Sequence, residues 1–421
     1  MSDASGRLPD PTTGGPLVGV RVLDFSRVLA GPYCGRMLSD LGADVVKIEP
    51  PEGDLTRFAD PKVNSISLYY AQQNTGKRNV SIDLRRPEGI DLALRLAEHS
   101  DIVLENFRPG VMERLGLGYG AITARNPRVI YASITGYGQH GPWSNRRAYA
   151  VLIHAEAGLD ESGARLRRDA GDPSATAVQD GTSHADVYAG LHAASAILAA
   201  LFARERTGCG QHIDVAMAEA LLHSNDFAHW DLAGAGSGER WAALAPAYSP
   251  IVRTGAGTSI TIAGDPAAPG VFERYVSALD RPDLLDDPRF APESRRLHRR
   301  ALRDIIESWT LSFDDLDHLE EVLDSHDLPI GRLRTVADLV DTDWARERGV
   351  VARVPDRGGG TVPVPQAPWR FSSLPVGVRG EPAYRGEHNR EVLGDLLGLT
   401  DAELDALDAG GVISSRLPRR S

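Results

Sequence analysis

The chain has 421 residues, 42% of them hydrophobic and 25% charged, and a formal net charge of −12 at pH 7. Its length allows two domains, and its acidic balance argues against nucleic-acid binding through bulk charge. No apolar run approaches the length of a membrane span, and the N-terminal residues lack a signal-peptide core. The two cysteines, Cys34 and Cys209, are far apart in sequence, which argues against a disulfide scaffold and predicts a cytoplasmic protein.

The first half of the chain alternates between short apolar runs and helical patterns. Strands are predicted at 20–25, 44–48, 79–84, 101–104 and 129–134, and helices around 37–41 and at 87–99. A strand, a helix and a second strand in this order form a βαβ unit, whose two strands are parallel. The pattern therefore predicts an α/β fold with a parallel sheet.

The turns after these strands are the first candidate ligand sites, because open parallel sheets bind ligands at the carboxyl ends of their strands. After the first strand the sequence reads VLAGPYCG, which is not the GxGxxG fingerprint of NAD and FAD sites. This loop argues against a dinucleotide and leaves another adenosine-containing ligand open. By position, Asn106, Phe107 and the turn at 136–138 are site candidates, with ordinary βα turns as the alternative.

Basic residues gather around these turns in an otherwise acidic protein. They are Lys77, Arg78, Arg85, Arg86, Arg108, Arg114, Arg146 and Arg147. Arginine binds phosphate through paired hydrogen bonds. The grouping favours an anionic, phosphate-bearing ligand over a merely solvated surface.

The stretch 183–214 places one acid, Asp186, ahead of a long apolar helix rich in small residues, with Gly208 as its stop signal. Its larger apolar positions recur near helical spacing at Leu191, Ala194, Leu198, Leu201 and Phe202. A carboxylate in the first turn of a helix meets exposed backbone N–H groups and the positive end of the dipole, and both favour its ionised form. Asp186 is therefore either a helix cap or a reactive carboxylate.

The organisation of the sequence changes after residue 225. The predicted large domain consists of 1–225 and 336–421, and a smaller middle domain consists of 226–335, with a strand at 258–262 and a helical pattern over 271–323. Short strand-like runs with proline-rich links follow from residue 330, with a hairpin turn at 358–360 and a final pair of helices.

Several catalytic and metal-binding motifs are missing from the sequence. It contains no HExxH, no Cys-x-x-Cys pair, no GxSxG elbow and no Walker loop. No metal is therefore predicted. Cys34 is predicted to be a packed small thiol, because no neighbour in sequence would depress its pKa.

Longer segments resemble the family III CoA-transferases, the group that contains formyl-CoA transferase and carnitine CoA-transferase together with α-methylacyl-CoA racemase. The resemblance rests on VLDFSRVLAGP, LGADVVKIEPPEGD, GKRNVSIDL, ADVYAG with ILAALFARERTGCGQHIDVAM, and GEHNREVLGDLLGL, and it covers nearly the whole chain. The segment around GADVVKIE and the segment from Asp186 to Gln211 are specific when they occur together.

The resemblance implies a Rossmann-like large domain built from both chain ends, a smaller middle domain and a homodimer of two interlocked rings. Asp186 stands where the family has its catalytic aspartate. The implied contacts to coenzyme A are Val28, Leu29, Ala30, Asn106, Phe107, Arg114, Arg147 and Tyr149. The implied substrates are an acyl-CoA and a carboxylic acid, and neither ATP nor a metal is needed.

An aspartate suits this chemistry, because a carboxylate that attacks a thioester forms a mixed anhydride that retains the thioester's energy. The released CoA thiolate then attacks the aspartyl carbonyl and leaves an enzyme-bound CoA thioester. An acceptor carboxylate repeats the two steps in reverse. Backbone N–H groups near the nucleophile would stabilise the oxyanions, and water must be kept out.

Two departures from the family pattern bear on the substrate and the reaction. Leu29 replaces a glutamine of formyl-CoA transferase, which argues against a formate or oxalate preference and for a larger or less polar acyl group. Tyr149 stands where the racemase branch has a histidine base, and His154 is expected to point elsewhere. A neutral tyrosine is a poor base for an α-proton, so a transferase is favoured over a racemase.

A CoA-binding protein without catalysis is the third alternative, with Asp186 only capping its helix. The glycine-rich loop that covers the aspartate in some transferases is not evident. Similar sequence occurs only at 254–257.

Overall fold

The protein is described by a computed structural model, which describes residues 14–233 and 246–416. It divides into two compact units. The large unit comprises Met1–Ala157, Gly181–Ser224 and Asp343–Ser421, and the small unit comprises Gly158–Asp180 and Asn225–Thr342. The sequence prediction assigned 158–180 to the large domain. These residues group instead with the middle segment, because Leu166 and Ala170 pack against Tyr248.

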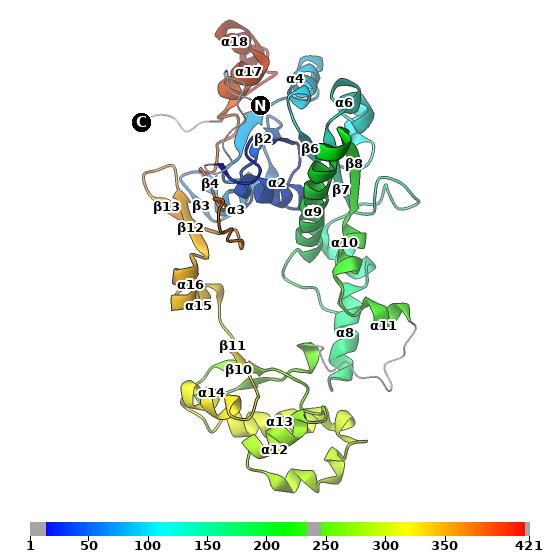
Figure 1. The fold of residues 1–421 in the computed structure, drawn as a ribbon, viewed down its shortest axis with the longest axis vertical. Helices are drawn as coiled ribbons and strands as arrows, with labels where there is room; N and C mark the ends of the chain where they lie inside the picture. The colour runs from blue at the N-terminus through cyan, green and yellow to red at the C-terminus, as the bar shows by residue number, and fades with distance from the viewer. Residues whose placement is uncertain (1–13, 234–245, 417–421) are drawn as a thin grey trace. The chain divides into compact units, whose positions relative to one another are not determined.

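A six-stranded parallel sheet forms the centre of the large unit (Figure 1). Its strands are β1 (Arg21–Asp24), β2 (Asp44–Glu49), β5 (Arg78–Ser81), β6 (Ile102–Glu105), β7 (Ile130–Thr135) and β8 (Gln211–Ala216). They lie in the order β5-β2-β1-β6-β7-β8, and every neighbouring pair is parallel. From β1 the chain moves outward to β5, returns to β6 and moves outward on the other side, which is the doubly wound order. The predicted α/β class and parallel sheet are confirmed.

The strands are buried because helices cover the sheet, which explains why they read as continuous apolar runs. Strands β6 and β7 are buried along their whole length, whereas β8 at the edge is mostly exposed. The helices of the large unit are α2 (Ala30–Asp40), α3 (Leu68–Asn74), α4 (Pro87–Glu98), α5 (Val111–Arg114), α6 (Tyr119–Arg125), α7 (Ala150–Glu156), α9 (His184–Thr207), α10 (Met217–Ser224), α16 (Asp343–Arg348), α17 (Asn389–Leu397) and α18 (Asp401–Ala409), with a 3-10 turn η1 (Leu55–Phe58).

Two small hairpins complete the large unit: β3 (Lys62–Val63) with β4 (Ile66–Ser67), and β12 (Val351–Pro355) with β13 (Thr361–Pro365). The turn predicted at 358–360 joins β12 to β13, so this prediction is confirmed. The C-terminal helices share the core of the N-terminal sheet, since Val392 and Leu404 pack in one cluster with Val80 and Val103. Both ends of the chain therefore build the large unit.

Helix α9 ends as the sequence predicts, with Gly208 in a left-handed conformation at its C-terminus, but it begins at His184, so Asp186 lies inside its first turn and not ahead of it. Of the apolar positions noted in the sequence, Ala194 is buried, whereas Leu198 is exposed. Most buried positions of the helix are alanines such as Ala185, Ala189 and Ala193, and Ile197 is buried among them, whereas Phe202 is 61% exposed. Alanine and glycine allow the backbones of neighbouring elements to approach closely, so the face with the smallest residues turns inward.

Among the described residues, α9 is long and apolar enough to pass a test for a membrane span, contrary to the expectation from sequence. By length and composition alone this is weak evidence. The small residues of α9 are buried within the large unit, and Arg204 in its last turn pairs with Asp101 at 2.9 Å. One face of α9 therefore belongs to the interior of the large unit, whereas Leu198 and Phe202 on the rest of the helix are exposed.

The small unit contains α8 (Leu159–Asp169), α11 (Ala228–Leu232), β9 (Ile251–Arg253), β10 (Ser259–Ile262), α12 (Val271–Ala278), α13 (Arg299–Thr310), α14 (Leu316–Asp324), β11 (Ile330–Arg332) and α15 (Val336–Val340). The three strands form an antiparallel sheet in the order β11-β10-β9. The helical pattern predicted over 271–323 is interrupted by 3-10 turns that begin at Pro282 and Pro288. Residues 254–257 form the turn of the β9–β10 hairpin.

Candidate active site

The centre of the site is the point where the strand order reverses, between β1 and β6. Doubly wound sheets bind ligands there, outside the carboxyl ends of the strands. Strand β1 leads through the turn at 25–29 into α2, and β6 leads into Asn106 and Phe107. The two turns identified from sequence are thus neighbours in the structure.

Asn106 joins these two turns. Its side-chain oxygen accepts a hydrogen bond from the backbone N–H of Arg27 at 2.7 Å, and its amide donates to the carbonyl of the same residue at 2.8 Å. The guanidinium of Arg27 lies 5.7 Å from the ring centroid of Phe107. Asn106 therefore holds the first turn in place through backbone contacts.

Asp186 occupies the third position of α9, after the N-cap residue Ser183, and its side chain is partly buried. Its carboxylate accepts hydrogen bonds from its own backbone N–H and from the N–H of Ala30, the first residue of α2. Leu29, the N-cap of α2, provides no side-chain cap. Asp186 thus caps α2 as well as α9, which the interpretation as a cap of its own helix did not foresee.

The ionisation of Asp186 differs from the sequence expectation. Burial raises its pKa to about 6, although the N–H groups of Ala30 and of Asp186 itself act in the opposite direction. The helix ends therefore favour the carboxylate, as predicted, but burial outweighs them. At pH 7 the group is still mostly ionised, and it is more basic than an ordinary aspartate.

Close packing of α2 on α9 brings the two groups together. A Cβ atom added at Gly190, one turn after Asp186, would lie 2.7 Å from the carbonyl oxygen of Ala30 and 3.0 Å from Cδ1 of Tyr33. Only glycine fits this approach. Tyr69 on α3 is also near, since burial and then the charge of Asp186 raise its pKa.

The remaining predicted ligand residues lie on the elements that follow β6 and β7. Arg114 ends the short helix α5, and Tyr149, 65% exposed, precedes α7. A Cβ atom at Gly136 would lie 2.2 Å from Cβ of Ala148, so the segment that carries Arg147 returns to the end of β7. These residues are therefore at the same edge of the sheet as the two turns.

The basic residues around the turns have different partners. Lys77 is buried against Asp24 at 3.0 Å and Arg78 binds Asp44 at 2.6 Å, so these two do not belong to a phosphate site as predicted. Three others are engaged with carboxylates: Arg85 with Asp83 and Glu52, Arg86 with Asp83, and Arg146 with Glu156. Arg108, Arg114 and Arg147 are exposed and form no ion pair within the described residues.

His154 does not point away from the site, contrary to expectation. Its side chain has no exposed surface, and Nε2 accepts a hydrogen bond from the backbone N–H of Ala185 at 3.2 Å. It therefore lies at the N-terminus of α9, against Ala185, the residue that precedes Asp186. Because Nε2 is engaged with the backbone, it is not open to a substrate in this arrangement.

A cavity of about 220 Å³ lies at the carboxyl ends of β1, β2 and β5. It is lined by apolar side chains such as Phe25, Ile48 and Phe107 and by two cations and two acids, Arg27, Arg85, Glu52 and Asp83. Because Arg85 is already paired with Glu52 and Asp83, the apolar walls and Arg27 are the parts of this cavity that remain open to a ligand. A larger cavity of about 420 Å³ between α2, α9 and residues 365–371 does not contain Asp186.

The described residues contain no group of three or more histidines, cysteines or acids arranged to hold a metal. Cys34 is fully buried, and burial raises the pKa of its thiol, so the prediction of a packed small thiol is confirmed. Sequence reasoning missed Lys47 and Asp54, which are buried beneath the first turn. A lysine between Val46 and Ile48 in an otherwise apolar strand was the available signal.

Comparisons with known proteins cover nearly the whole chain. Residues 17–389 match the family model described as CoA-transferase family III. The succinyl-CoA–D-citramalate CoA-transferase of Chloroflexus aurantiacus is 35% identical over 405 residues, which span 94% of this chain and 98% of that protein. The formyl-CoA:oxalate CoA-transferase of Streptomyces avermitilis is 34% identical, with 94% and 99% covered. Among solved structures, a CAIB/BAIF family protein from Brucella suis has a TM-score of 0.77 at 33% identity, with 91% and 100% covered.

Proposed function

The chain belongs to CoA-transferase family III and is an acyl-CoA:carboxylate CoA-transferase, and we propose that Asp186 is its nucleophile. The observation that carries this proposal is the position of the Asp186 carboxylate, shared by the N-termini of α9 and α2. Backbone N–H groups orient it, and burial makes it a stronger base than a solvated aspartate. A weakly solvated, mostly ionised carboxylate is what attack on a thioester requires.

The proposed reaction proceeds in two symmetrical halves. The Asp186 carboxylate attacks the acyl carbonyl of the donor, the C–S bond breaks, and a mixed anhydride and CoA thiolate form. The thiolate then attacks the aspartyl carbonyl, which releases the donor acid as a carboxylate and leaves an aspartyl-CoA thioester. An acceptor carboxylate attacks this thioester and expels the thiolate, which finally attacks the acyl carbonyl of the new anhydride and restores Asp186.

Coenzyme A is proposed to bind along the edge of the sheet that contains the switch point. Val28, Leu29, Ala30, Asn106, Phe107, Arg114, Arg147 and Tyr149 are the proposed contacts. The exposed guanidinium groups of Arg114 and Arg147 are available for phosphate, since neither forms an ion pair within the described residues. The apolar side chain of Leu29, 8% exposed, supports an acyl group larger or less polar than formyl.

We also propose that the protein is a cytoplasmic homodimer of interlocked rings, as the family resemblance implies. The exposed apolar side chains of α9, Leu198 at 36% and Phe202 at 61%, are consistent with a covered surface. Light scattering of the purified protein measures the oligomeric state. A monomer at micromolar concentration contradicts the dimer but leaves the chemistry untouched.

The racemase alternative is weaker in this structure. It needs a second base beside the substrate's α-carbon, and neither candidate is suitable: Tyr149 is a neutral phenol, and Nε2 of His154 binds the N–H of Ala185. Deuterium incorporation at the α-carbon without acyl exchange would support the racemase. A protein that binds acyl-CoA and shows neither reaction would be a binding protein.

An acyl-exchange screen tests the proposed function. Succinyl-CoA, acetyl-CoA and formyl-CoA are paired with a panel of carboxylic acids, and Asp186→Asn is the control. We expect exchange with at least one pair, a loss of roughly 10³-fold or more in Asp186→Asn, and hydroxylamine capture of Asp186 as a hydroxamate, read by peptide mass. Exchange at the wild-type rate by Asp186→Asn contradicts the mechanism.

A further inference from the structure

The turn between β1 and α2 contains a backbone conformation that needs an explanation. Val28 has a φ of 67°, in the left-handed region, where a β-branched side chain is a genuine outlier. Glycine adopts this conformation without a steric penalty. A strained residue persists only where its surroundings over-determine it, and such residues cluster at functional sites.

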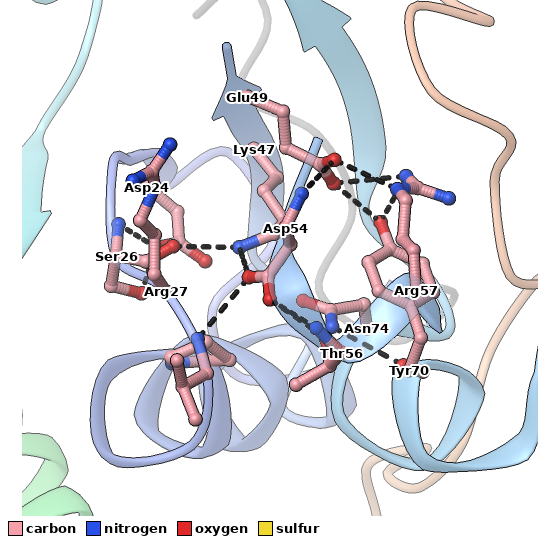
Figure 2. Close-up of polar contacts among 12 residues, drawn as sticks. Asp24, Ser26, Arg27, Lys47, Glu49, Asp54, Thr56, Arg57, Tyr70 and Asn74 are labelled. Carbon is pink, nitrogen blue, oxygen red and sulfur yellow. Dashed lines mark hydrogen bonds and ion pairs between the residues drawn. The ribbon is translucent and has the colours of Figure 1, made fainter. Parts of the chain in front are cut away.

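Buried side chains from several elements hold the turn at consecutive residues (Figure 2). Asp24 accepts the backbone N–H of Ser26 at 2.9 Å, and Nζ of Lys47 donates to the carbonyl of the same residue at 2.7 Å. Asn106 binds both backbone groups of Arg27, as described above. The carboxylate of Asp54 accepts the N–H of Val28 itself at 3.2 Å. Each contact reaches the turn from outside.

The side chain of Asp54 is held in place by contacts with Thr56 and Lys47, in addition to its hydrogen bond with Val28. Its Oδ1 accepts from the backbone N–H of Thr56 at 2.9 Å and from the hydroxyl of that residue at 2.8 Å. Its Oδ2 lies 3.4 Å from Nζ of Lys47, and neither side chain has any exposed surface. Burial alone would raise the pKa of Asp54, but Lys47, Thr56 and the N–H of Val28 together lower it. The acceptor for Val28 is therefore a fixed carboxylate.

A second layer supports Asp54. Its own N–H donates to Oε2 of Glu49 at 2.9 Å, and Glu49 in turn binds Arg57 at 2.7 Å and accepts from the hydroxyl of Tyr70 at 2.9 Å (Figure 2). The guanidinium of Arg57 lies 3.8 Å from the ring centroid of Tyr70. This arrangement ties the loop after β2 to α3 and leaves Asp54 little freedom to move.

The path of the turn decides where α2 begins. Two residues after Val28, the backbone of Ala30 lies against α9, since its carbonyl oxygen would be 2.7 Å from a Cβ atom at Gly190, and its N–H faces the carboxylate of Asp186. If Val28 relaxed to a negative φ, the following peptides would rotate, and the N–H of Ala30 would no longer point at the carboxylate. Asp186 would then keep only the hydrogen bond from its own N–H.

We propose that Asp54 and Lys47 are positioning residues for the nucleophile: they hold Val28 in the left-handed conformation and thereby direct the N–H of Ala30 onto Asp186. This inference rests on the proposed function, since it assigns a purpose to the geometry of Asp186. Neither residue touches the reacting atoms. A merely structural pair would affect stability and leave the state of Asp186 unchanged, so the test needs a readout of Asp186 itself.

The main variant is Asp54→Leu/Lys47→Met, which removes the acceptor for Val28 without leaving an unpaired buried charge. Asp54→Asn keeps an oxygen at the same position and is the conservative variant. Each is made with and without Val28→Gly, because glycine adopts the turn without the hydrogen bond. The matched control is Arg36→Met/Asp40→Leu, which removes a different buried ion pair. This pair lies on α2, and both of its side chains are 6% exposed.

Two quantities are measured on the folded protein. The first is kcat with KM for the acyl-CoA. The second is the pH at which Asp186 is half-labelled by a carbodiimide with glycinamide, followed by peptide mass and independent of any transferase activity. Loss of a hydrogen bond to the carboxylate raises its pKa, so this midpoint should move upward.

In the main variant we expect kcat to fall about 10- to 100-fold with KM within about 3-fold, and the labelling midpoint to rise by at least about half a pH unit. Asp54→Asn should lose less. When Val28→Gly is added to the main variant, kcat and the labelling midpoint should both differ less from those of Val28→Gly alone than the main variant differs from wild type. The control pair should lower thermal stability, with kcat within about 2-fold and the labelling midpoint within about 0.2 pH units of wild type.

An unchanged midpoint in the main variant, or an absence of recovery by Val28→Gly, overturns the proposal. If the main variant does not fold, Asp54→Asn with and without Val28→Gly decides: its labelling midpoint should still rise, by less than about half a pH unit, and no rise, or no recovery by Val28→Gly, overturns the proposal. If no acyl exchange is found for the wild-type protein, the proposed function fails, and the labelling midpoint still decides whether Asp54 and Lys47 position Asp186.

Discussion

Each unit of the protein buries an ion pair in its interior, and the two pairs stabilise different kinds of backbone. In the large unit Lys47 lies 3.4 Å from Asp54, and in the small unit Arg299 lies 2.6 Å from Asp265. Both carboxylates are without exposed surface. A buried ion pair is weak evidence for stability, because removing the charges from water costs much of what their attraction returns. What separates the two pairs is the backbone that each one holds.

In the small unit the pair holds ordinary backbone. Asp265 accepts the N–H of Ala267 at 2.9 Å, and Arg299 donates to the carbonyl of Asp169 at the end of α8 at 2.9 Å. In the large unit Asp54 holds Val28, which is left-handed. The first pair ties elements of a core together, whereas the second maintains a conformation that the chain would not adopt by itself.

The largest effect on stability is expected from breaking the pair in the small unit. Arg299→Leu leaves Asp265 buried without its partner, which should destabilise the small unit by about 3–5 kcal/mol. Urea unfolding followed by the fluorescence of Trp230 and Trp309, both in this unit, measures the loss. Arg281→Leu is the control, since its pair with Asp283 is exposed, and its unfolding midpoint should not move. Equal midpoints for the two variants would mean that burial does not set the strength of the pair.

The difference between the pairs also shows what the sequence could predict. Strands such as β6 and β7 were found because they are continuous apolar runs, and α9 was found from its stop signal at Gly208. The helical spacing of its apolar residues did not reveal which face of α9 points inward, since Ala194 is buried but Leu198 and Phe202 are exposed. The interior side of this helix is set by how closely α2 approaches at Gly190, and a single sequence does not contain that distance.

At the site, the sequence predicted residues that stand at the end of a strand or the start of a helix. It did not predict residues whose role depends on contacts with residues distant in sequence. Asn106 follows a strand and Asp186 lies in the first turn of a helix, so both positions indicate a function. Asp54 lies in a loop, and nothing in its neighbourhood predicts that it will meet Lys47 and Val28. The engagement of Lys77 with Asp24 was likewise invisible, because their partnership depends on the order of strands in the sheet.

Gly190→Ala should damage the large unit in a way that connects packing with chemistry. The added methyl group would lie 2.7 Å from the carbonyl oxygen of Ala30, so α2 and α9 must separate. Overpacking of this kind costs about 1–3 kcal/mol. Because Ala30 also donates to Asp186, we expect exchange activity to fall by more than the fraction of unfolded protein explains. Thermal melting and kcat of the same sample separate the two contributions.

A smaller effect is expected from Asp186, because its ionised side chain lowers the free energy of unfolding. Burial raises the pKa of Asp186 from 3.8 to about 6, so the folded state binds this proton more tightly than the unfolded state does. Wild-type protein should therefore lose stability relative to Asp186→Asn as the pH rises from about 4 to about 6, with a constant difference above that. Solvent screening limits the size of the effect, because the side chain of Asp186 is only partly buried. Melting temperatures of both proteins between pH 4 and pH 8 test it, and a difference that shrinks with rising pH contradicts the assignment.

The smallest expected effect has the opposite sign and comes from the small unit. Gly163 lies inside α8 with a right-handed backbone, and the nearest atom to an added Cβ is the end of the Arg167 side chain at 3.6 Å. Alanine fits there and lowers the entropy of the unfolded chain, so Gly163→Ala should stabilise the protein by about 0.5–1 kcal/mol without changing kcat. The same substitution at Gly190 should destabilise it. If both glycines tolerated alanine equally, the close approach of α2 to α9 would not be a constraint, and the site would owe its geometry to the turn at Val28 alone.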